Sequence, residues 1–193
     1  RAVIHNHPFF VDLQQQMTDE ISQRVGEAVE PCYNFLSLYN NLGVCRVHMD
    51  APSAKWTFDY CIRQSAPWPI HFSQVRPWPE SWQAKDEDWE TRIKSDPENH
   101  FTNFSLQENQ AIIFGGSSQW HFRERIAQKE KQNFCHLVFF HYIPQGTRAL
   151  TEPGTWSGLF GIPELDMVIE RDKNVDYGSF EVNPARAMPR SAG

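Results

Sequence analysis

The stretch "LGVCRVHMDAPSAKWTFDYCI", residues 42–62, sets a histidine and an aspartate two positions apart inside a largely apolar run. Side chains two positions apart on a β-strand point to the same face, so His48 and Asp50 would reach into one space. An imidazole and a carboxylate that converge on one point are typical ligands of a metal ion, which needs at least one more ligand. The stretch therefore predicts a strand that carries two ligands of a metal site.

Strand-like segments follow one another on both sides of this stretch. After Pro31 the chain reads "CYNFLSLYN", "GVCRVHMD" and "KWTFDYCI", separated by turn residues such as Asn40, Gly43 and Pro52. Strand patterns return after Phe101 as "QAIIF", "SQWHFRERI" and "NFCHLVFFHY", and the last two could form a hairpin across "AQKEKQ". Many short strands after a single helical segment favour a mainly β fold, either a sandwich or a barrel.

Three segments lie outside the strand pattern. Residues 8–28 form one helix within an N-terminal helical segment 8–30, because apolar residues recur at steps of three and four and Pro8 suits a first turn. The connection 76–100 is rich in tryptophan and proline, which indicates either a lid over a site or a solvent-exposed insertion. Residues 144–193 form a C-terminal extension of a single domain, 1–193, whose β core spans 31–143.

The composition excludes several classes of protein. A chain of 193 residues with 13% aromatic residues suits one folded domain, and a net charge of −6 argues against a nucleic-acid partner. No apolar run approaches ~18 residues, so no membrane span is expected. The four cysteines form no CxxC pair, which predicts reduced thiols in a cytoplasmic protein and no structural zinc site. The oligomeric state is left open.

The third metal ligand has to come from elsewhere in the chain. His48, His121, His136 and His141 lie in strand-like runs, where a histidine is usually a hydrogen-bonded core residue. His121 is the best candidate, because it follows the turn "GGSS" inside "SQWHFRERI". Two histidines and one carboxylate make the facial triad of mononuclear non-haem Fe(II) oxygenases, which leaves coordination positions open.

The motifs and their order resemble those of the Fe(II)/2-oxoglutarate-dependent dioxygenase superfamily, especially a bacterial and phage branch with a late "HWRE…VFLHY" signature. The resemblance spans about residues 8–143 and rests on "PCYNFLSLYN", "HMD", "WTFDYCI", "PWPIHF", "IIFGGSSQWHFRERI" and "LVFFHY". It implies a double-stranded β-helix of the jelly-roll, cupin-like type. It also implies Fe(II) bound by His48, Asp50 and His121, with 2-oxoglutarate and O₂ as co-substrates. The implied reaction is hydroxylation of a small molecule, with 2-oxoglutarate converted to succinate and CO₂.

A 2-oxoglutarate enzyme needs a cation for the distal carboxylate of the co-substrate. Arg123 is favoured, because it lies two residues after His121 and shares its face. Arg125 would share that face too, and either arginine could instead be an exterior ion-pair residue. The superfamily more often places this cation near the next strand, where Lys131 stands in the polar loop and His136 would be a weaker partner.

Hydroxyl groups are further candidates for the co-substrate site. Tyr33 and Thr57, and also Tyr39 and Tyr60, could donate hydrogen bonds to it, although partnered core residues are the commoner explanation. By strand alternation, the side chains of Trp120 and Phe122 point away from the metal and into packing.

The chain also departs from the branch that it resembles. Ala51 stands where that branch has arginine, Arg125 where it has proline, and Ser37 or a neighbour where an arginine is expected in the first strand. The substrates of the branch therefore cannot be transferred to this chain. A cupin-type metal enzyme that does not use 2-oxoglutarate, and a non-catalytic β-barrel binding protein, remain the alternatives.

Overall fold

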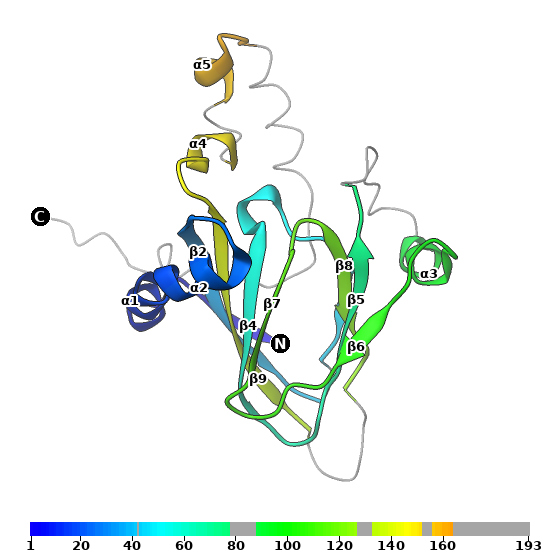
Figure 1. The fold of residues 1–193 in the computed structure, drawn as a ribbon. Helices are drawn as coiled ribbons and strands as arrows, with labels where there is room; N and C mark the ends of the chain where they lie inside the picture. The colour runs from blue at the N-terminus through cyan, green and yellow to red at the C-terminus, as the bar shows by residue number, and fades with distance from the viewer. Residues whose placement is uncertain (42, 78–87, 127–132, 152–155, 164–193) are drawn as a thin grey trace, which may run out of the picture.

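The computed structural model describes residues 1–41, 43–77, 88–126, 133–151 and 156–163. Two antiparallel sheets face each other (Figure 1). Sheet A has the order β1-β2-β9-β4-β7, and sheet B has the order β3-β8-β5-β6. Sheet A consists of β1 (Ala2–His5), β2 (Val29–Tyr39), β9 (Cys135–Pro144), β4 (Trp56–Gln64) and β7 (Ala111–Phe114). Sheet B consists of β3 (Cys45–His48), β8 (Gln119–Arg123), β5 (Ile70–Val75) and β6 (Thr102–Phe104).

The chain winds between the two sheets as it proceeds. From β2 to β5 each strand joins the opposite sheet from the one before it, and β7, β8 and β9 alternate in the same way. This winding makes a double-stranded β-helix, and the predicted mainly β fold is confirmed. The predicted hairpin between "SQWHFRERI" and "NFCHLVFFHY" is wrong, because β8 pairs with β3 and β5 whereas β9 pairs with β2 and β4. Its proposed loop, residues 127–132, lies outside the described residues.

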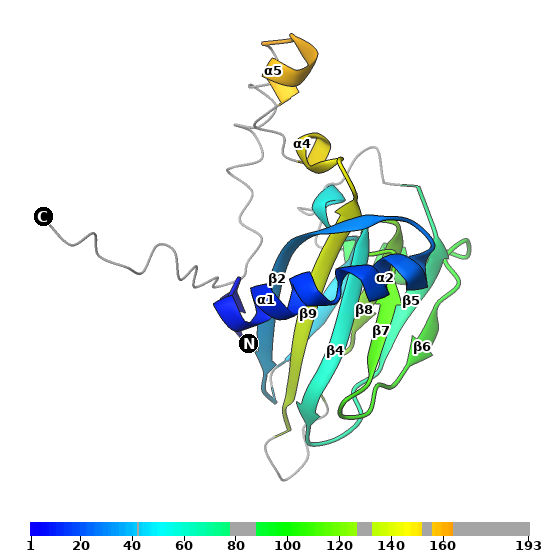
Figure 2. The same cartoon turned by 60° about the vertical axis from the view of Figure 1, so that its left-hand side comes forward.

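Two helices cover the outer face of sheet A (Figure 2). The predicted single helix is divided into α1, Pro8–Gln16, and α2, Thr18–Val25, by Met17 with φ −83° and ψ −7°. Gly26 ends α2 with φ 77°, a left-handed conformation that glycine adopts without a Cβ penalty. Apolar side chains of both helices, among them Phe10 and Ile21, pack on outward-facing residues of the sheet such as Phe58, Val138 and Phe140.

The outer face of sheet B is covered by α3, Trp89–Ser95. Trp89 and Ile93 pack against Val47, Met49, Trp120 and Phe122, which alternate with the metal-ligand candidates along residues 47–50 and along β8. Trp120 and Phe122 therefore do point away from the predicted site. Of the two alternatives for the connection 76–100, the lid does not hold for Trp89, because this side chain packs on the outer face of sheet B, away from the predicted site. The other two tryptophans of the connection, Trp78 and Trp82, lie outside the described residues.

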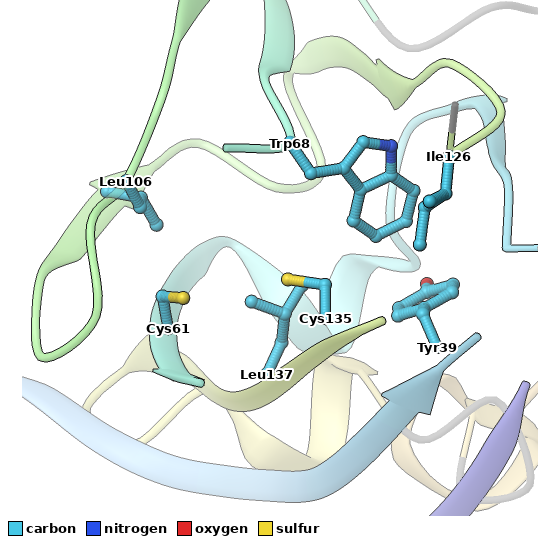
Figure 3. Packing of buried hydrophobic residues seen from close by; sticks show 7 residues of the cluster. All are labelled: Tyr39, Cys61, Trp68, Leu106, Ile126, Cys135 and Leu137. Atoms are coloured by element: carbon cyan, nitrogen blue, oxygen red, sulfur yellow. The ribbon is translucent and has the colours of Figure 1, made fainter. Parts of the chain in front are cut away.

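A buried cluster closes the sandwich at the end where β2 and β4 finish. It contains Tyr39, Cys61, Trp68, Leu106, Ile126, Cys135 and Leu137 (Figure 3). All four cysteines are free thiols. Cys61 and Cys135 are buried, whereas Cys32 and Cys45 are half-buried. The remaining helices are short: a 3₁₀ turn at Pro52–Ala54, α4 at Arg148–Thr151 and α5 at Trp156–Phe160. No helix in the described ranges combines the length and the apolar character needed to cross a membrane.

Candidate metal centre

The structure brings the three predicted ligands to one place between the sheets. His48 ends β3, Asp50 follows it by two residues, and His121 lies opposite His48 on the neighbouring strand β8. Asp50 Oδ1 is 3.4 Å from His48 Nε2 and 3.6 Å from His121 Nε2. One ligand atom from each residue lies within 4.8 Å of the others. We call this group the His–Asp–His cluster.

Both imidazole rings are oriented by backbone carbonyls. His48 Nδ1 lies 2.7 Å from the carbonyl oxygen of Arg46, and His121 Nδ1 lies 2.9 Å from that of Gln119. A ring nitrogen that faces a carbonyl oxygen carries the proton, because two lone pairs would repel. The other nitrogen, Nε2, then presents its lone pair, which is the form of imidazole that binds metals. Both Nε2 atoms point toward Asp50.

The carboxylate of Asp50 is fixed from the opposite sheet. Thr57 Oγ1 on β4 donates a hydrogen bond of 2.7 Å to Asp50 Oδ2, and the Asp50 amide donates one of 2.8 Å to the Gly116 carbonyl. Oδ1 is therefore left facing the two histidines. The hydroxyl of Thr57, which was predicted to bind the co-substrate, donates to Asp50 in this structure, where it holds a candidate ligand in place. Its role in co-substrate binding stays a prediction.

The electrostatics of the cluster favour a charged carboxylate. Burial opposes ionisation of Asp50, but the positive charge that the rings of His121 and His48 carry in their protonated form outweighs burial and holds the pKa of this carboxyl well below its usual range. The side chains of His48, Asp50 and His121 are 37%, 14% and 5% exposed. His121 is screened by the rings of Phe72 and Phe114, whose centroids lie 6.4 Å and 4.8 Å from its own. Solvent and ligands therefore reach the cluster from the side of His48.

Gly116 is a residue that sequence reasoning missed, and the two glycines of the "GGSS" turn are the signal that could have found it. A Cβ atom added to Gly116 would overlap Thr57 Oγ1 and Asp50 Oδ2, and would lie 2.6 Å from the backbone oxygen of Ala54. The backbone of this turn approaches the carboxylate so closely that only glycine fits.

We expect Gly116→Ala to displace the Asp50 carboxylate and to lower metal affinity by roughly 10- to 100-fold, the range found when groups that orient metal ligands are lost. Calorimetric titration of metal-free protein with a divalent cation measures this directly. Gly158→Ala is the matched control, because nothing lies within 4 Å of its added Cβ. Equal affinities of the two variants would show that Gly116 does not set the position of Asp50.

Arg123 faces the interior from the same side of β8 as His121, as strand alternation predicts. Its side chain is 2% exposed and donates to Asp59 Oδ2 at 2.5 Å and to the carbonyl oxygen of Trp68. Asp59 is fully buried on β4, and its Oδ1 has no hydrogen-bond partner among the described residues. Sequence reasoning missed Asp59, although a carboxylate inside the apolar run "WTFDYCI" is the signal of a buried ion pair.

The other predicted co-substrate residues are placed differently. Arg125 is exposed, and Lys131 lies outside the described residues. Tyr33 is half-buried on β2, where its ring stacks on His141 with a centroid distance of 4.0 Å. The alternative cation His136 lies half-buried on β9. Roles in co-substrate binding for Arg123, Arg125, Lys131 and Tyr33 stay predictions.

No protein-family model matches this sequence, and no curated protein is significantly similar to it. Among solved structures, the fold is similar to the non-haem alpha-ketoglutarate-dependent carbocyclase SnoK from nogalamycin biosynthesis. The identity is 11%, the TM-score is 0.53, and the match covers 77% of this chain and 69% of SnoK. At this identity the likeness shows the fold alone. It confirms the predicted class, a double-stranded β-helix of the kind found in a 2-oxoglutarate-dependent enzyme.

Two further solved structures show weaker likeness. The non-haem alpha-ketoglutarate-dependent epimerase SnoN from nogalamycin biosynthesis matches with 12% identity and a TM-score of 0.47, over 75% of this chain and 64% of that one. HygX from Streptomyces hygroscopicus, solved with iron bound, matches with 10% identity and a TM-score of 0.48, over 72% of this chain and 69% of that one.

Proposed function

We propose that this protein is a non-haem Fe(II)/2-oxoglutarate-dependent oxygenase that hydroxylates a small molecule. One observation carries the proposal: His48, Asp50 and His121 place one ring nitrogen of each histidine and one carboxylate oxygen within 4.8 Å of one another. The fold likeness to SnoK supports it, because the same architecture there belongs to an enzyme described as alpha-ketoglutarate-dependent.

The donor set fits Fe(II) better than a structural metal. Two imidazoles and one carboxylate leave positions open for other ligands, whereas a closed structural zinc site has four protein ligands and is usually rich in thiolates. Iron held here would supply the activation of O₂ that couples oxidative decarboxylation of 2-oxoglutarate to substrate oxidation. The chain supplies the rest. Thr57 keeps Asp50 in place, the carbonyls of Arg46 and Gln119 set the imidazole tautomers, and Phe72 and Phe114 keep water from His121.

Arg123 is the residue that we propose for the distal carboxylate of 2-oxoglutarate. Its guanidinium lies one inward position beyond His121, but Asp59 already balances its charge. Burial raises the pKa of Asp59, although Arg123 opposes this shift. A second carboxylate beside Arg123 would favour the neutral form of Asp59 further, because like charges cannot both ionise easily at short range. By taking up a proton, Asp59 would release Arg123 from the ion pair, and the guanidinium could then bind the carboxylate of the co-substrate.

The proposal is tested by adding Fe(II) and then 2-oxoglutarate to metal-free protein without oxygen. We expect one equivalent of Fe(II) to bind, and 2-oxoglutarate to produce a visible charge-transfer band that glutarate, which lacks the keto group, does not produce. Succinate release on admission of air, screened over small molecules, then identifies substrates. Iron binding without an effect of 2-oxoglutarate would instead indicate the cupin-type alternative, and an absence of metal binding would indicate a binding protein.

A further inference from the structure

A buried charged pair, Asp59 and Arg123, lies between the sheets next to the His–Asp–His cluster. On β4, Asp59 follows Thr57, which holds Asp50, by two positions, and on β8 Arg123 follows His121 by two positions. Inward-facing neighbours on one strand lie roughly 7 Å apart. A ligand with the length of a five-carbon diacid, bound at the cluster, therefore has its far end at this pair.

The hydrogen-bonding capacity of the pair is only partly used. Asp59 is 0% exposed, and its Oδ1 has no partner in the part of the chain that the structure describes. Arg123 is 2% exposed and donates to Asp59 Oδ2 at 2.5 Å and to the Trp68 carbonyl. A guanidinium has five N–H donors, so three of them have no acceptor within the described ranges. Buried polar atoms usually have partners, so Oδ1 and these donors mark a place where a polar ligand can bind.

Uncharged groups surround Asp59 on its own sheet. The residues opposite it are apolar, Phe139 on β9 and Ile112 on β7. The same face of sheet A also carries Cys61, the next inward position on β4, and Cys135 on β9. Burial raises the pKa of both thiols, that of Cys135 to about 12, so neither is charged at neutral pH. Sheet A therefore offers no charge that balances Asp59.

The charges that act on Asp59 come from the other sheet. Arg123 contacts it directly, whereas Cys45 on β3 lies opposite Arg123. Burial raises the pKa of the Asp59 carboxyl, Arg123 opposes this shift, and the smaller effects of His121 and Asp50 act in opposite directions. Arg123 is thus the main reason for Asp59 to stay ionised, and an anion that competes for Arg123 makes the protonated form of Asp59 more favourable.

We propose that Asp59, in its acid form, is part of the binding site for the distal carboxylate of 2-oxoglutarate, so that each co-substrate molecule binds together with one proton. This inference rests on the proposed function and adds to it a second residue of the co-substrate site and a pH dependence. The Asp59 hydroxyl donates a hydrogen bond to the co-substrate, and Arg123 donates to it through its remaining N–H groups. The two carboxyl groups and the guanidinium are then neutral together, whereas without the proton they would bury an uncompensated negative charge.

The same arrangement distinguishes a carboxylate from an amide. When Asp59 is ionised, it accepts and Arg123 donates, which fits a primary amide without any proton. When Asp59 is protonated, both residues donate, which fits a carboxylate. Two probes differ in this group alone. N-oxalylglycine is an analogue of 2-oxoglutarate in which NH replaces a methylene group, and N-oxalylglycinamide is its distal amide.

Calorimetric titration of Fe(II)-loaded protein without oxygen counts the protons, because proton uptake adds a heat that depends on the ionisation enthalpy of the buffer. We expect N-oxalylglycine to take up about one proton and to lose affinity about tenfold between about pH 7 and about pH 8, since the bound state holds the extra proton. The amide should bind without proton uptake and with equal affinity at both pH values.

The outcomes separate this inference from the proposed function. Binding of N-oxalylglycine without proton uptake, or uptake of a proton by both ligands alike, would overturn the role of Asp59 and leave the proposed function intact. If neither ligand binds to protein that holds Fe(II), the proposed function is wrong and this inference is wrong with it.

Asp59→Asn assigns the proton to one residue. Its side-chain amide can donate a hydrogen bond as the acid does, but it cannot take up a proton. We expect proton uptake with N-oxalylglycine to fall to about zero and the affinity to become independent of pH. Asp12→Asn is the matched control, because Asp12 is an exposed carboxylate on α1, and it should keep the uptake of about one proton.

Folding of Asp59→Asn is checked by circular dichroism, because this variant removes the ion-pair partner of buried Arg123. If the variant does not fold, the comparison of the two ligands on the unaltered protein decides alone. Proton uptake that persists in folded Asp59→Asn would assign the proton to another group and overturn the proposal.

Discussion

Replacing His121 with alanine is expected to abolish metal binding and turnover together. His121 supplies one of three candidate ligands, and at 5% side-chain exposure its place cannot be taken easily by solvent. Loss of groups that merely orient a ligand already costs roughly 10- to 100-fold in metal affinity, so loss of the ligand itself should exceed this range. Competitive titration of Fe(II) against a chelator measures the affinity, and succinate release measures the turnover. His48→Ala should behave in the same way.

Two further variants serve as comparisons, one at a histidine outside the cluster and one at the carboxylate of the cluster. His136→Ala removes a histidine that pairs with Leu38 and Arg63, five residues along β9 from the position opposite Thr57, and this variant should bind metal normally. Asp50→Ala should lose turnover but retain part of its metal, because water or chloride can occupy the position of the carboxylate. Full metal occupancy in both His48→Ala and His121→Ala would refute the assignment of the ligands.

Strand alternation explains why much of the candidate site was predictable from the sequence. The rule that neighbours two apart share a face placed His48 with Asp50 and Arg123 with His121, and it turned Trp120 and Phe122 outward. This rule depends on the geometry of a single strand, so it needs no knowledge of the strand's partners. The prediction of the fold class needed only the number of strands and the motifs that they carry.

Features that depend on pairing between distant segments were not predictable in this way. Asp59 and Arg123 are far apart in the sequence, and they form an ion pair only because the two sheets that carry them face each other. The same limit explains the wrong hairpin, because hydrophobic patterns do not state which sheet a strand joins. Composition likewise showed that the connection 76–100 has apolar side chains, but not that Trp89 would cover the outer face of sheet B.

Arg123→Met is expected to have two separate effects, one on stability and one on co-substrate binding. Asp59 is fully buried, and Arg123 is its ion-pair partner. Removing one member of a buried pair leaves an uncompensated charge and typically costs about 3–5 kcal/mol. Because burial already raises the pKa of Asp59, this carboxyl can take up a proton and limit the loss. We therefore expect the free energy of unfolding in urea to fall by about 3 kcal/mol, at the lower end of that range.

The second effect follows if Arg123 anchors 2-oxoglutarate. Losing a charge-assisted pair should weaken the co-substrate by roughly 30- to 1,000-fold, or about 2–4 kcal/mol, while Fe(II) binding stays near normal. The double variant Arg123→Met with Asp59→Asn separates the two effects, because it removes both charges. It should regain most of the stability and still bind 2-oxoglutarate weakly. Arg125→Met and Lys131→Met test the other cations. Normal 2-oxoglutarate binding by Arg123→Met, together with its loss in Lys131→Met, would make Lys131 the anchor and leave Arg123 a structural partner of Asp59.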